Sequence, residues 1–230
     1  MTRVKICGLM NQRDASLCVQ AGVHMLGFVV DYPTPVPWNL TRDAAKELIG
    51  QVPPFVSTCI VTGGNAEHVI ETALETTPNV VQLHYKETLN DIRKIAGTLK
   101  SHGIKTMKAL RISKEGKCDF EIIDPALAAR ELCKTGISAI IVDSYTEAMP
   151  GGTGVMVDLE TFQKIQQEST LPVVLAGGLN PANIAPLVQQ VNPFAVDVLT
   201  GVEVKPGQKA PEKITAFINK IHRSEQAKRS

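Results

Sequence analysis

The 230-residue chain has little net charge, no long apolar run and no signal-peptide pattern, and each absence excludes a class of protein. Its formal net charge is +1, so it presents neither the basic surface that binds nucleic acid nor an acidic surface for a polycation. No apolar run approaches the roughly 20 residues that cross a bilayer, and the N-terminal residues lack the apolar segment of a signal peptide. We therefore expect neither nucleic acid nor a membrane among the partners.

The five cysteines also lack the spacings that define metal sites and disulfide frameworks. There is no Cys-x-x-Cys pair and no Cys/His pattern with the spacing of zinc ligands, so we expect no metal. An odd number of scattered thiols argues against a disulfide framework and favours the reducing cytoplasm as the location.

Short apolar runs alternate with amphipathic stretches along the chain, and most are unbroken, as in parallel strands buried on both faces. We expect strands at Arg3–Cys7, Met25–Val30, Phe55–Val61, Val80–Leu83, Thr106–Leu110, Ala139–Val142, Pro172–Ala176 and Ala195–Val198. We expect helices at Asn11–Ala21, Thr41–Ile49, Ala66–Glu75, Leu89–Ser101, Asp119–Lys134, Leu159–Glu168, Pro181–Gln190 and Pro211–Ile221. Eight strand–helix pairs without a long linker predict an α/β fold, a single-domain (β/α)8 TIM barrel over residues 1–222, with a polar, disordered tail over 223–230.

Cys7 ends the first expected strand, and Gly8 allows the chain to turn there toward a helix. In (β/α)8 barrels the carboxyl ends of the strands carry the chemistry. A cysteine is more often a small buried hydrophobe, so a catalytic role depends on its partners. Asp143 follows the sixth strand, across the barrel from the first, and is the candidate acid–base partner. The alternative for this aspartate is a structural cap or ion pair.

Two glycine turns follow the last two expected strands, where barrels commonly bind a phosphate. Gly177 and Gly178 follow the seventh strand and precede a helix, while Thr200 and Gly201 follow the eighth. Glycines allow backbone N–H groups to face a ligand without interference from a side chain. We therefore predict a phosphate site at these two turns.

Other residues that follow strands are candidates for contact with the substrate. Lys5 alternates with Cys7 on the first strand, and we expect its positive charge to lower the pKa of the thiol. Trp38, in a proline-rich loop, either forms an aromatic wall or packs on the rim. His84 is either a hydrogen-bonded rim residue or an acid–base group, and Arg111 either anchors an anion or forms an ion pair. For Gly152, we expect a flexible glycine-rich turn that can approach a ligand closely.

Together, these motifs resemble those of the phosphoribosylanthranilate isomerase family of tryptophan biosynthesis. The resemblance runs in order through Lys5-Ile6-Cys7-Gly8, Leu26-Gly27-Phe28, Gln82-Leu83-His84, Val142-Asp143-Ser144, Gly151-Gly152-Thr153-Gly154, Ala176-Gly177-Gly178-Leu179-Asn180-Pro181 and Gly201-Val202-Glu203. It implies a barrel without cofactor that performs an Amadori rearrangement of a small phosphosugar. In that reaction N-(5-phosphoribosyl)anthranilate becomes 1-(2-carboxyphenylamino)-1-deoxyribulose 5-phosphate. By the same resemblance Cys7 is the general base and Asp143 the general acid.

The chain departs from the family mainly after its second strand. Members usually carry a Ser-Pro-Arg run there, whose arginine meets the anthranilate carboxylate, whereas Tyr32–Trp38 contains no arginine. Arg111 or another donor must then bind that carboxylate, or the substrate carries a different amine. Two alternatives stay open: an Amadori-type or other phosphosugar enzyme for another phosphoribosyl amine, and a non-catalytic barrel that binds a phosphate ligand. The sequence is compatible with a monomer or a homodimer.

Overall fold

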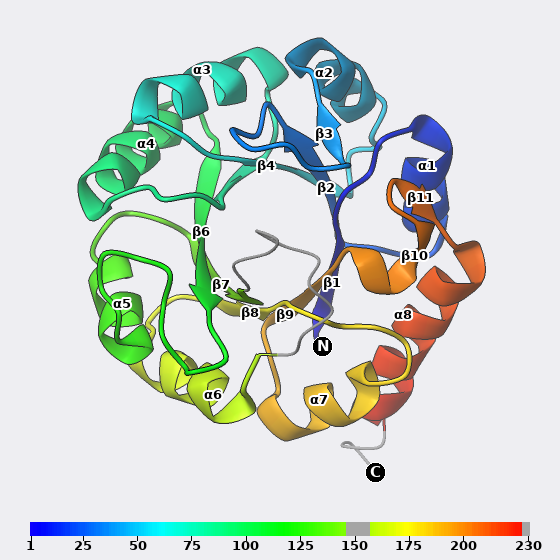
Figure 1. The fold of residues 1–230 in the computed structure, drawn as a ribbon. Helices are drawn as coiled ribbons and strands as arrows, with labels where there is room; N and C mark the ends of the chain where they lie inside the picture. The colour runs from blue at the N-terminus through cyan, green and yellow to red at the C-terminus, as the bar shows by residue number, and fades with distance from the viewer. Residues whose placement is uncertain (146–156, 227–230) are drawn as a thin grey trace.

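The computed structural model describes residues 1–145 and 157–226 and shows a closed barrel of parallel strands surrounded by helices (Figure 1). Within these residues the barrel strands are β1 (Arg3–Ile6), β2 (Met25–Val30), β4 (Ser57–Thr62), β5 (Val80–Leu83), β6 (Lys105–Ile112), β7 (Ala139–Ser144), β8 (Val173–Leu175) and β9 (Ala195–Val198). They follow one another around the barrel in chain order, and β9 pairs in parallel with β1 to close it. The predicted (β/α)8 TIM barrel is confirmed.

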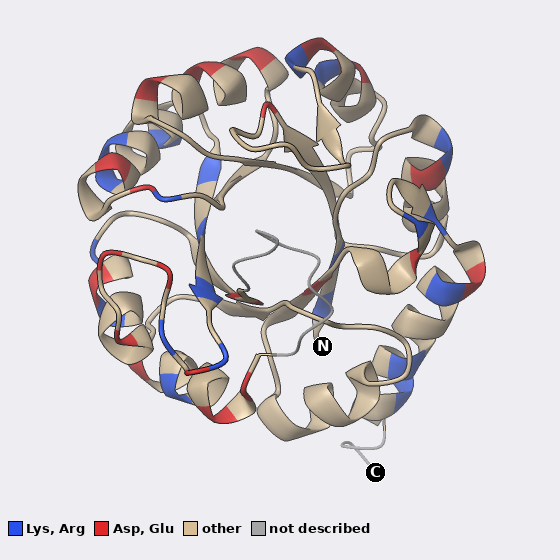
Figure 2. Ribbon diagram, in the orientation of Figure 1, with Lys and Arg blue, Asp and Glu red and all other residues tan. Residues whose placement is uncertain are grey.

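The helices lie outside the barrel and alternate with its strands (Figure 1). In the described ranges they are α1 (Gln12–Gln20), α2 (Arg42–Gly50), α3 (Ala66–Thr76), α4 (Leu89–Ser101), α5 (Pro125–Leu132), α6 (Leu159–Glu168), α7 (Ile184–Val191) and α8 (Pro211–Gln226). Asn11, Thr88 and Asp158 cap α1, α4 and α6, each accepting a bond from a backbone N–H three residues on. Most of the helices carry charges of both signs, whereas α3 carries only acidic residues and α7 carries no Lys, Arg, Asp or Glu (Figure 2). None of the described helices is long and apolar enough to cross a bilayer.

Short elements surround the mouth of the barrel. The two-residue strand β3 (Asn39–Leu40) pairs with the end of β2. After β9 come the 3-10 helix η1 (Thr200–Val202) and the hairpin of β10 (Glu203–Lys205) and β11 (Gln208–Lys209). These elements therefore belong to the end of the barrel at which the strands finish.

Apolar side chains pack in layers that determine where a ligand can bind. One layer joins the strands to the surrounding helices. A second layer fills the barrel interior, with Cys59, Met107 and Ile141 among its members. A third cluster, at the carboxyl ends of the strands, comprises Cys7, Val29, Tyr32, Trp38 and Val61. Because the interior is filled, a ligand site must lie at the mouth, beside this third cluster.

Helix α5 begins later than the sequence predicts, at Pro125 rather than Asp119. The side chain of Asp124 caps the helix by accepting a bond from the Leu127 N–H. The preceding residues form a loop, in which the Asp119 carboxylate contacts Arg111 of β6. The amphipathic pattern before Pro125 thus reflects a loop that packs on the barrel, not a helix.

Helix α8 ends later than the sequence predicts, at Gln226 rather than Ile221. Ser224, inside the segment predicted as a tail, is buried, and its hydroxyl donates to the Ala185 carbonyl at 3.2 Å. Tertiary contact therefore extends the helix beyond its apolar pattern. Residues 227–230 lie outside the described part of the chain.

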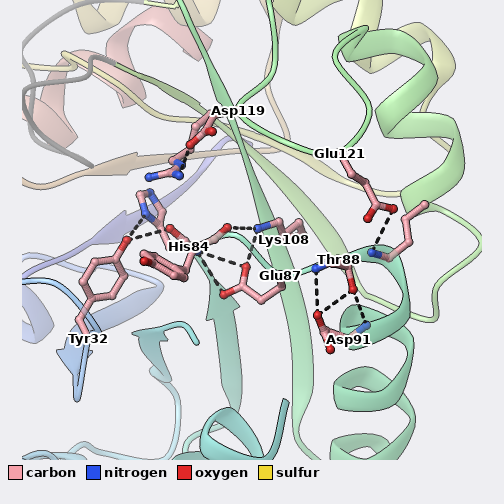
Figure 3. Close-up of polar contacts among 11 residues, drawn as sticks. Tyr32, His84, Glu87, Thr88, Asp91, Lys108, Asp119 and Glu121 are labelled. Atoms are coloured by element: carbon pink, nitrogen blue, oxygen red, sulfur yellow. Dashed lines mark hydrogen bonds and ion pairs between the residues drawn. The ribbon is translucent and has the colours of Figure 1, made fainter. Parts of the chain in front are cut away.

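A buried ion pair holds the loop between β5 and α4 against the barrel (Figure 3). Lys108 Nζ lies 2.6 Å from Glu87 Oε2 and donates to the Tyr85 carbonyl at 2.7 Å. The Glu87 carboxylate accepts a bond from the Tyr85 N–H at 3.2 Å, and both charged side chains are almost completely buried. Removal of one partner would leave the other charge buried without a counter-charge.

Replacing Lys108 with methionine is expected to lower the free energy of unfolding by about 3–5 kcal/mol, because the Glu87 carboxylate loses its ion partner in the interior. Urea denaturation followed by circular dichroism measures this loss. The matched control is Lys94→Met, because Lys94 pairs with Glu67 on the exposed surface and its removal should leave the midpoint near that of the wild type. Equal losses in the two variants would contradict the argument.

Candidate active site

A pocket at the mouth of the barrel brings together most of the residues that the sequence singles out. Its lining includes Cys7 after β1, His84 after β5 and Asp143 in β7. It also includes Trp38 and the glycine-turn residues Gly177, Gly178 and Thr200. Lys5, Arg111 and Gly201 lie outside this lining, and Gly152 lies outside the described residues.

Cys7 is almost completely buried, and its position depends on a glycine of the neighbouring strand. Its N–H donates to the Val198 carbonyl at 2.9 Å, which places the residue at the end of the β1–β9 ladder. A Cβ at Gly27 of β2 would lie 2.8 Å from Cys7 Sγ and 3.1 Å from Lys5 Nζ. A side chain at position 27 would therefore displace both the thiol and the ammonium group.

Lys5 and Asp197 form a buried ion pair beneath the thiol. Lys5 Nζ donates to Asp197 Oδ2 at 2.7 Å, and the two residues face each other in the β1–β9 register. Burial is the largest single influence and would lower the pKa of Lys5, but Asp197, together with Cys7 and Cys59, raises that pKa above its ordinary value. Lys5 therefore keeps a positive charge close to Cys7.

The pKa of the Cys7 thiol lies above its ordinary value, so the prediction of a lowered pKa is wrong. Burial raises it most, because the thiolate loses its hydration, while the charge of Lys5 lowers it and that of Asp197 raises it again. The sequence shows the nearby cation correctly. It does not show how completely the fold removes water from the thiol.

Replacing Lys5 with methionine is expected to raise the pKa of Cys7 further, whereas Asp197→Asn is expected to lower it, because these charges act on the thiol with opposite sign. The measurement is the pH dependence of alkylation of Cys7 by iodoacetamide, quantified by mass spectrometry. Wild-type protein and the two variants should give three midpoints, with Lys5→Met highest and Asp197→Asn lowest. If all three midpoints coincide, Lys5 does not tune the thiol.

Asp143 is held between the backbone of its own strand and His84. Asp143 Oδ1 accepts a bond from the Ser144 N–H at 2.8 Å, and Oδ2 lies 3.2 Å from His84 Nε2. A Cβ at Gly177 would lie 3.1 Å from Asp143 Oδ1, and this glycine has a φ of +84°. Gly177 thus combines a turn conformation with a close approach to the carboxylate, and either feature alone favours glycine.

The two glycine turns pack against each other and form one cup. A Cβ at Gly201 would lie 1.8 Å from the Leu179 carbonyl oxygen, so only glycine allows the turn after β9 to touch the turn after β8. The side chains of Asn180 and Asn183 donate to the Gly178 carbonyl at 3.2 and 2.9 Å. Helix α7 begins at Ile184 and not at Pro181 as predicted, since the preceding residues form this turn.

Trp38 crosses from the β2–β3 loop to the segment after β9. It is almost completely buried, and its Nε1 donates to Glu203 Oε1 at 3.0 Å. Glu203 Oε1 also accepts bonds from Lys209 Nζ at 2.9 Å and from the Gly207 N–H at 3.1 Å. The indole therefore both lines the pocket and packs on the rim, so the two alternatives for Trp38 coexist. The Glu203–Lys209 ion pair was not predicted from the sequence, although Glu203 belongs to the Gly201-Val202-Glu203 motif.

Arg111 of β6 lies next to Asp143 in the β6–β7 register. Its guanidinium contacts the Asp119 carboxylate and lies 5.2 Å from the centre of the Tyr145 ring. It is thus a buried and paired cation beside the pocket, not an exposed one. Tyr32 is a further residue that sequence reasoning did not select as a site residue. It lines the pocket and contacts His84 (Figure 3).

Comparisons with known proteins point to one family. The sequence model described as N-(5′-phosphoribosyl)anthranilate (PRA) isomerase matches residues 4–220. The N-(5′-phosphoribosyl)anthranilate isomerase of Natronomonas pharaonis is 34% identical over 220 residues, which cover 95% of this chain and 97% of that protein. A solved phosphoribosyl anthranilate isomerase in complex with reduced 1-(o-carboxyphenylamino)-1-deoxyribulose 5-phosphate is 30% identical, with a TM-score of 0.74 over 96% of this chain and 99% of its own. A structure of monomers of the dimeric phosphoribosylanthranilate isomerase from Thermotoga maritima is 28% identical, with a TM-score of 0.75 over the same shares of the two chains.

Proposed function

The chain belongs to the N-(5′-phosphoribosyl)anthranilate isomerase family, and we propose that Cys7 and Asp143 perform its reaction as general base and general acid. The enzyme is an intramolecular aldose–ketose isomerase of tryptophan biosynthesis. It converts N-(5-phosphoribosyl)anthranilate to 1-(2-carboxyphenylamino)-1-deoxyribulose 5-phosphate by an Amadori rearrangement. The observation that carries the assignment of roles is that both side chains line one pocket together with the two glycine turns.

Asp143 acts in the first step, the opening of the ribose ring. As the bond between C1 and the ring oxygen breaks, that oxygen takes a proton from Asp143 and becomes a hydroxyl, while the amine nitrogen forms an iminium with C1. Positioned proton donors of this kind contribute about 10²–10⁴-fold to the rate. The short contact with the Ser144 N–H fixes the carboxyl group for this transfer.

Cys7 acts in the second step, the removal of the hydrogen at C2. The iminium withdraws electrons and makes that hydrogen acidic, and the thiolate takes it to leave an enolamine. The enolamine then loses the proton of its C2 hydroxyl and gains one at C1, which yields the ketone. Because an adjacent positive charge favours a thiolate, the iminium itself offsets the burial that raises the pKa of Cys7.

The phosphate is bound at the cup formed by Gly177, Gly178, Thr200 and Gly201. Residues of both turns support this assignment because Gly177, Gly178 and Thr200 line the pocket. The glycines at positions 177 and 201 allow the turns to pack closely, since an added Cβ there would clash with neighbouring backbone. Binding at this cup would place C1 and C2 of the sugar between Cys7 and Asp143, which line the same pocket.

The test of the proposed function is a fluorescence assay for the loss of phosphoribosylanthranilate. We expect the wild-type chain to reach a kcat/KM of about 10⁴ M⁻¹s⁻¹ or more, as enzymes do with their own substrates. Binding of the substrate without turnover would favour the non-catalytic barrel. Turnover of another phosphoribosyl amine in preference to phosphoribosylanthranilate would favour the different-amine alternative.

Arg111 is the proposed anchor of the anthranilate carboxylate. Arg111→Gln is expected to raise KM for phosphoribosylanthranilate about 10–100-fold, because a charge-assisted contact with the substrate carboxylate is lost. Steady-state kinetics measure this, with Lys114→Gln in the loop after β6 as the control. The variant should also lose any preference for phosphoribosylanthranilate over N-(5-phosphoribosyl)aniline, which has no carboxylate. An unchanged preference would exclude Arg111 as the anchor.

We also propose that the enzyme works in the cytoplasm and with a small phosphosugar as its partner. All five cysteines are free thiols, which supports a reducing location. A monomer and a homodimer both remain compatible with the chain. The dimeric relative from Thermotoga maritima supports the second of these states.

A further inference from the structure

Three residues from different parts of the barrel form one series of polar contacts that ends at Asp143. The Tyr32 hydroxyl donates to the His84 carbonyl at 2.9 Å and lies 3.4 Å from His84 Nδ1 (Figure 3). On the other side of the ring, His84 Nε2 lies 3.2 Å from Asp143 Oδ2. Tyr32 and His84 are both buried, and Asp143 is nearly so. The imidazole therefore connects a phenol to the proposed acid.

The positions of the protons in these contacts follow from the number of protons that each group carries. Tyr32 has one hydroxyl proton, and burial raises the pKa of Tyr32, so the hydroxyl keeps it. That proton lies toward the His84 carbonyl, which has none to donate. The contact between the Tyr32 oxygen and Nδ1 must then use a proton on Nδ1. In a neutral imidazole this leaves Nε2 as an unprotonated acceptor.

The same count of protons determines whether a proton lies between His84 Nε2 and the Asp143 carboxylate. An unprotonated Nε2 and an ionised carboxylate would bring two lone pairs together, so their contact requires exactly one shared proton. Either Asp143 holds it and donates to Nε2, or Nε2 holds it as imidazolium and donates to the carboxylate. We propose that Tyr32 locks His84 in the Nδ1–H tautomer, so that the His84–Asp143 pair retains the proton that opens the ribose ring.

The proposal rests on the role of Asp143 in the proposed function and extends it to two positioning residues. When the ring oxygen takes the proton from Asp143, the neutral Nδ1–H imidazole has no proton on Nε2 to stabilise the carboxylate that remains. The carboxylate is thus kept ready to take a proton back. The other tautomer would donate from Nε2 to the carboxylate and stabilise the inactive, proton-free form.

Other charged and titratable groups also face the His84–Asp143 pair, and they are the same in the wild type and in a Tyr32→Phe variant. Arg111 pairs in register with Asp143 from β6, and Asp197 of β9 interacts electrostatically with both members of the pair. Tyr85 and Glu87, from the loop after β5, lie near the phenol of Tyr32. A Tyr32→Phe variant keeps all four groups and removes only the oxygen that contacts Nδ1.

The direct test is the tautomer of His84 in the nitrogen spectrum of the wild-type protein, which does not depend on activity. Long-range ¹⁵N–¹H correlation distinguishes a protonated from an unprotonated ring nitrogen, and His84→Asn identifies the His84 signals among the five histidines. At alkaline pH we expect protonated Nδ1 in the wild type and a shift toward protonated Nε2 in Tyr32→Phe. Protonated Nε2 together with unprotonated Nδ1 in the wild type would overturn the proposal, even if Asp143 proves to be the acid.

The second test is the pH dependence of kcat. In Tyr32→Phe we expect the alkaline limb to move about one to two pH units toward acid, because Nε2–H now stabilises the carboxylate, while KM changes little. The control is Tyr85→Phe, whose ring lies 6.1 Å from that of Tyr32 at an angle of 88° and which should keep the wild-type profile. A uniform fall of kcat at every pH would assign Tyr32 a merely structural role and contradict the proposal.

Discussion

Replacing Cys7 with alanine is expected to lower kcat about 10²–10⁴-fold, because the enzyme then has no base to remove the hydrogen at C2. The change removes one sulfur atom from the apolar cluster at the mouth and leaves the Lys5–Asp197 pair intact. The residual reaction should show a large isotope effect with substrate deuterated at C2, because hydrogen removal then limits the rate. Substrate loss is followed by fluorescence.

Cys133→Ala is the matched control for this variant. Cys133 is the C-cap residue of α5, on the outside of the barrel, where it lies 3.6 Å from the Ser169 hydroxyl, and it does not line the pocket. This variant should keep the wild-type kcat. If Cys7→Ala also keeps a wild-type kcat, the thiol is not the base, and the buried cysteine is only part of the packing.

Asp143→Asn is expected to reduce kcat by a similar factor, about 10²–10⁴-fold, by slowing the opening of the ribose ring rather than the removal of the hydrogen at C2. An amide has the shape of the carboxyl group and retains contacts with Ser144 and His84, yet it cannot give a proton to the ring oxygen. Ring opening then limits the rate, so the isotope effect of deuterium at C2 should shrink. This opposite response distinguishes the acid from the base in one series of measurements.

Asp124→Asn is the control for the aspartate variant. Asp124 caps α5 and does not line the pocket, and asparagine caps helices about as well as aspartate, so activity and stability should be near those of the wild type. A large isotope effect in Asp143→Asn, equal to that in Cys7→Ala, would show that Asp143 does not open the ring.

Much of the fold could be predicted because local patterns and tertiary packing agree. Unbroken apolar runs such as Ala139–Val142 form strands that are buried on both faces, and their ends differ from prediction by only one or two residues. The starts of helices α1 and α4 also agree with the predicted ranges to within one residue, with Asn11 and Thr88 as the caps. The predicted helix boundaries are wrong at the starts of α5 and α7 and at the end of α8. At these positions a distant contact or a turn outweighs the local pattern.

The sequence by itself determined the barrel, the strand ends that carry Cys7 and Asp143, and the two glycine turns, because each depends on residues that are adjacent in the chain. Only the tertiary structure decided the pKa of the thiol and the protonation of the proposed acid. Burial of Cys7 raises its pKa against the charge of Lys5, and the count of protons between His84 and Asp143 depends on Tyr32, 52 residues before the histidine. Desolvation and hydrogen-bond partners depend on every strand that surrounds a group, so a local pattern names the chemical groups but not the state in which they act.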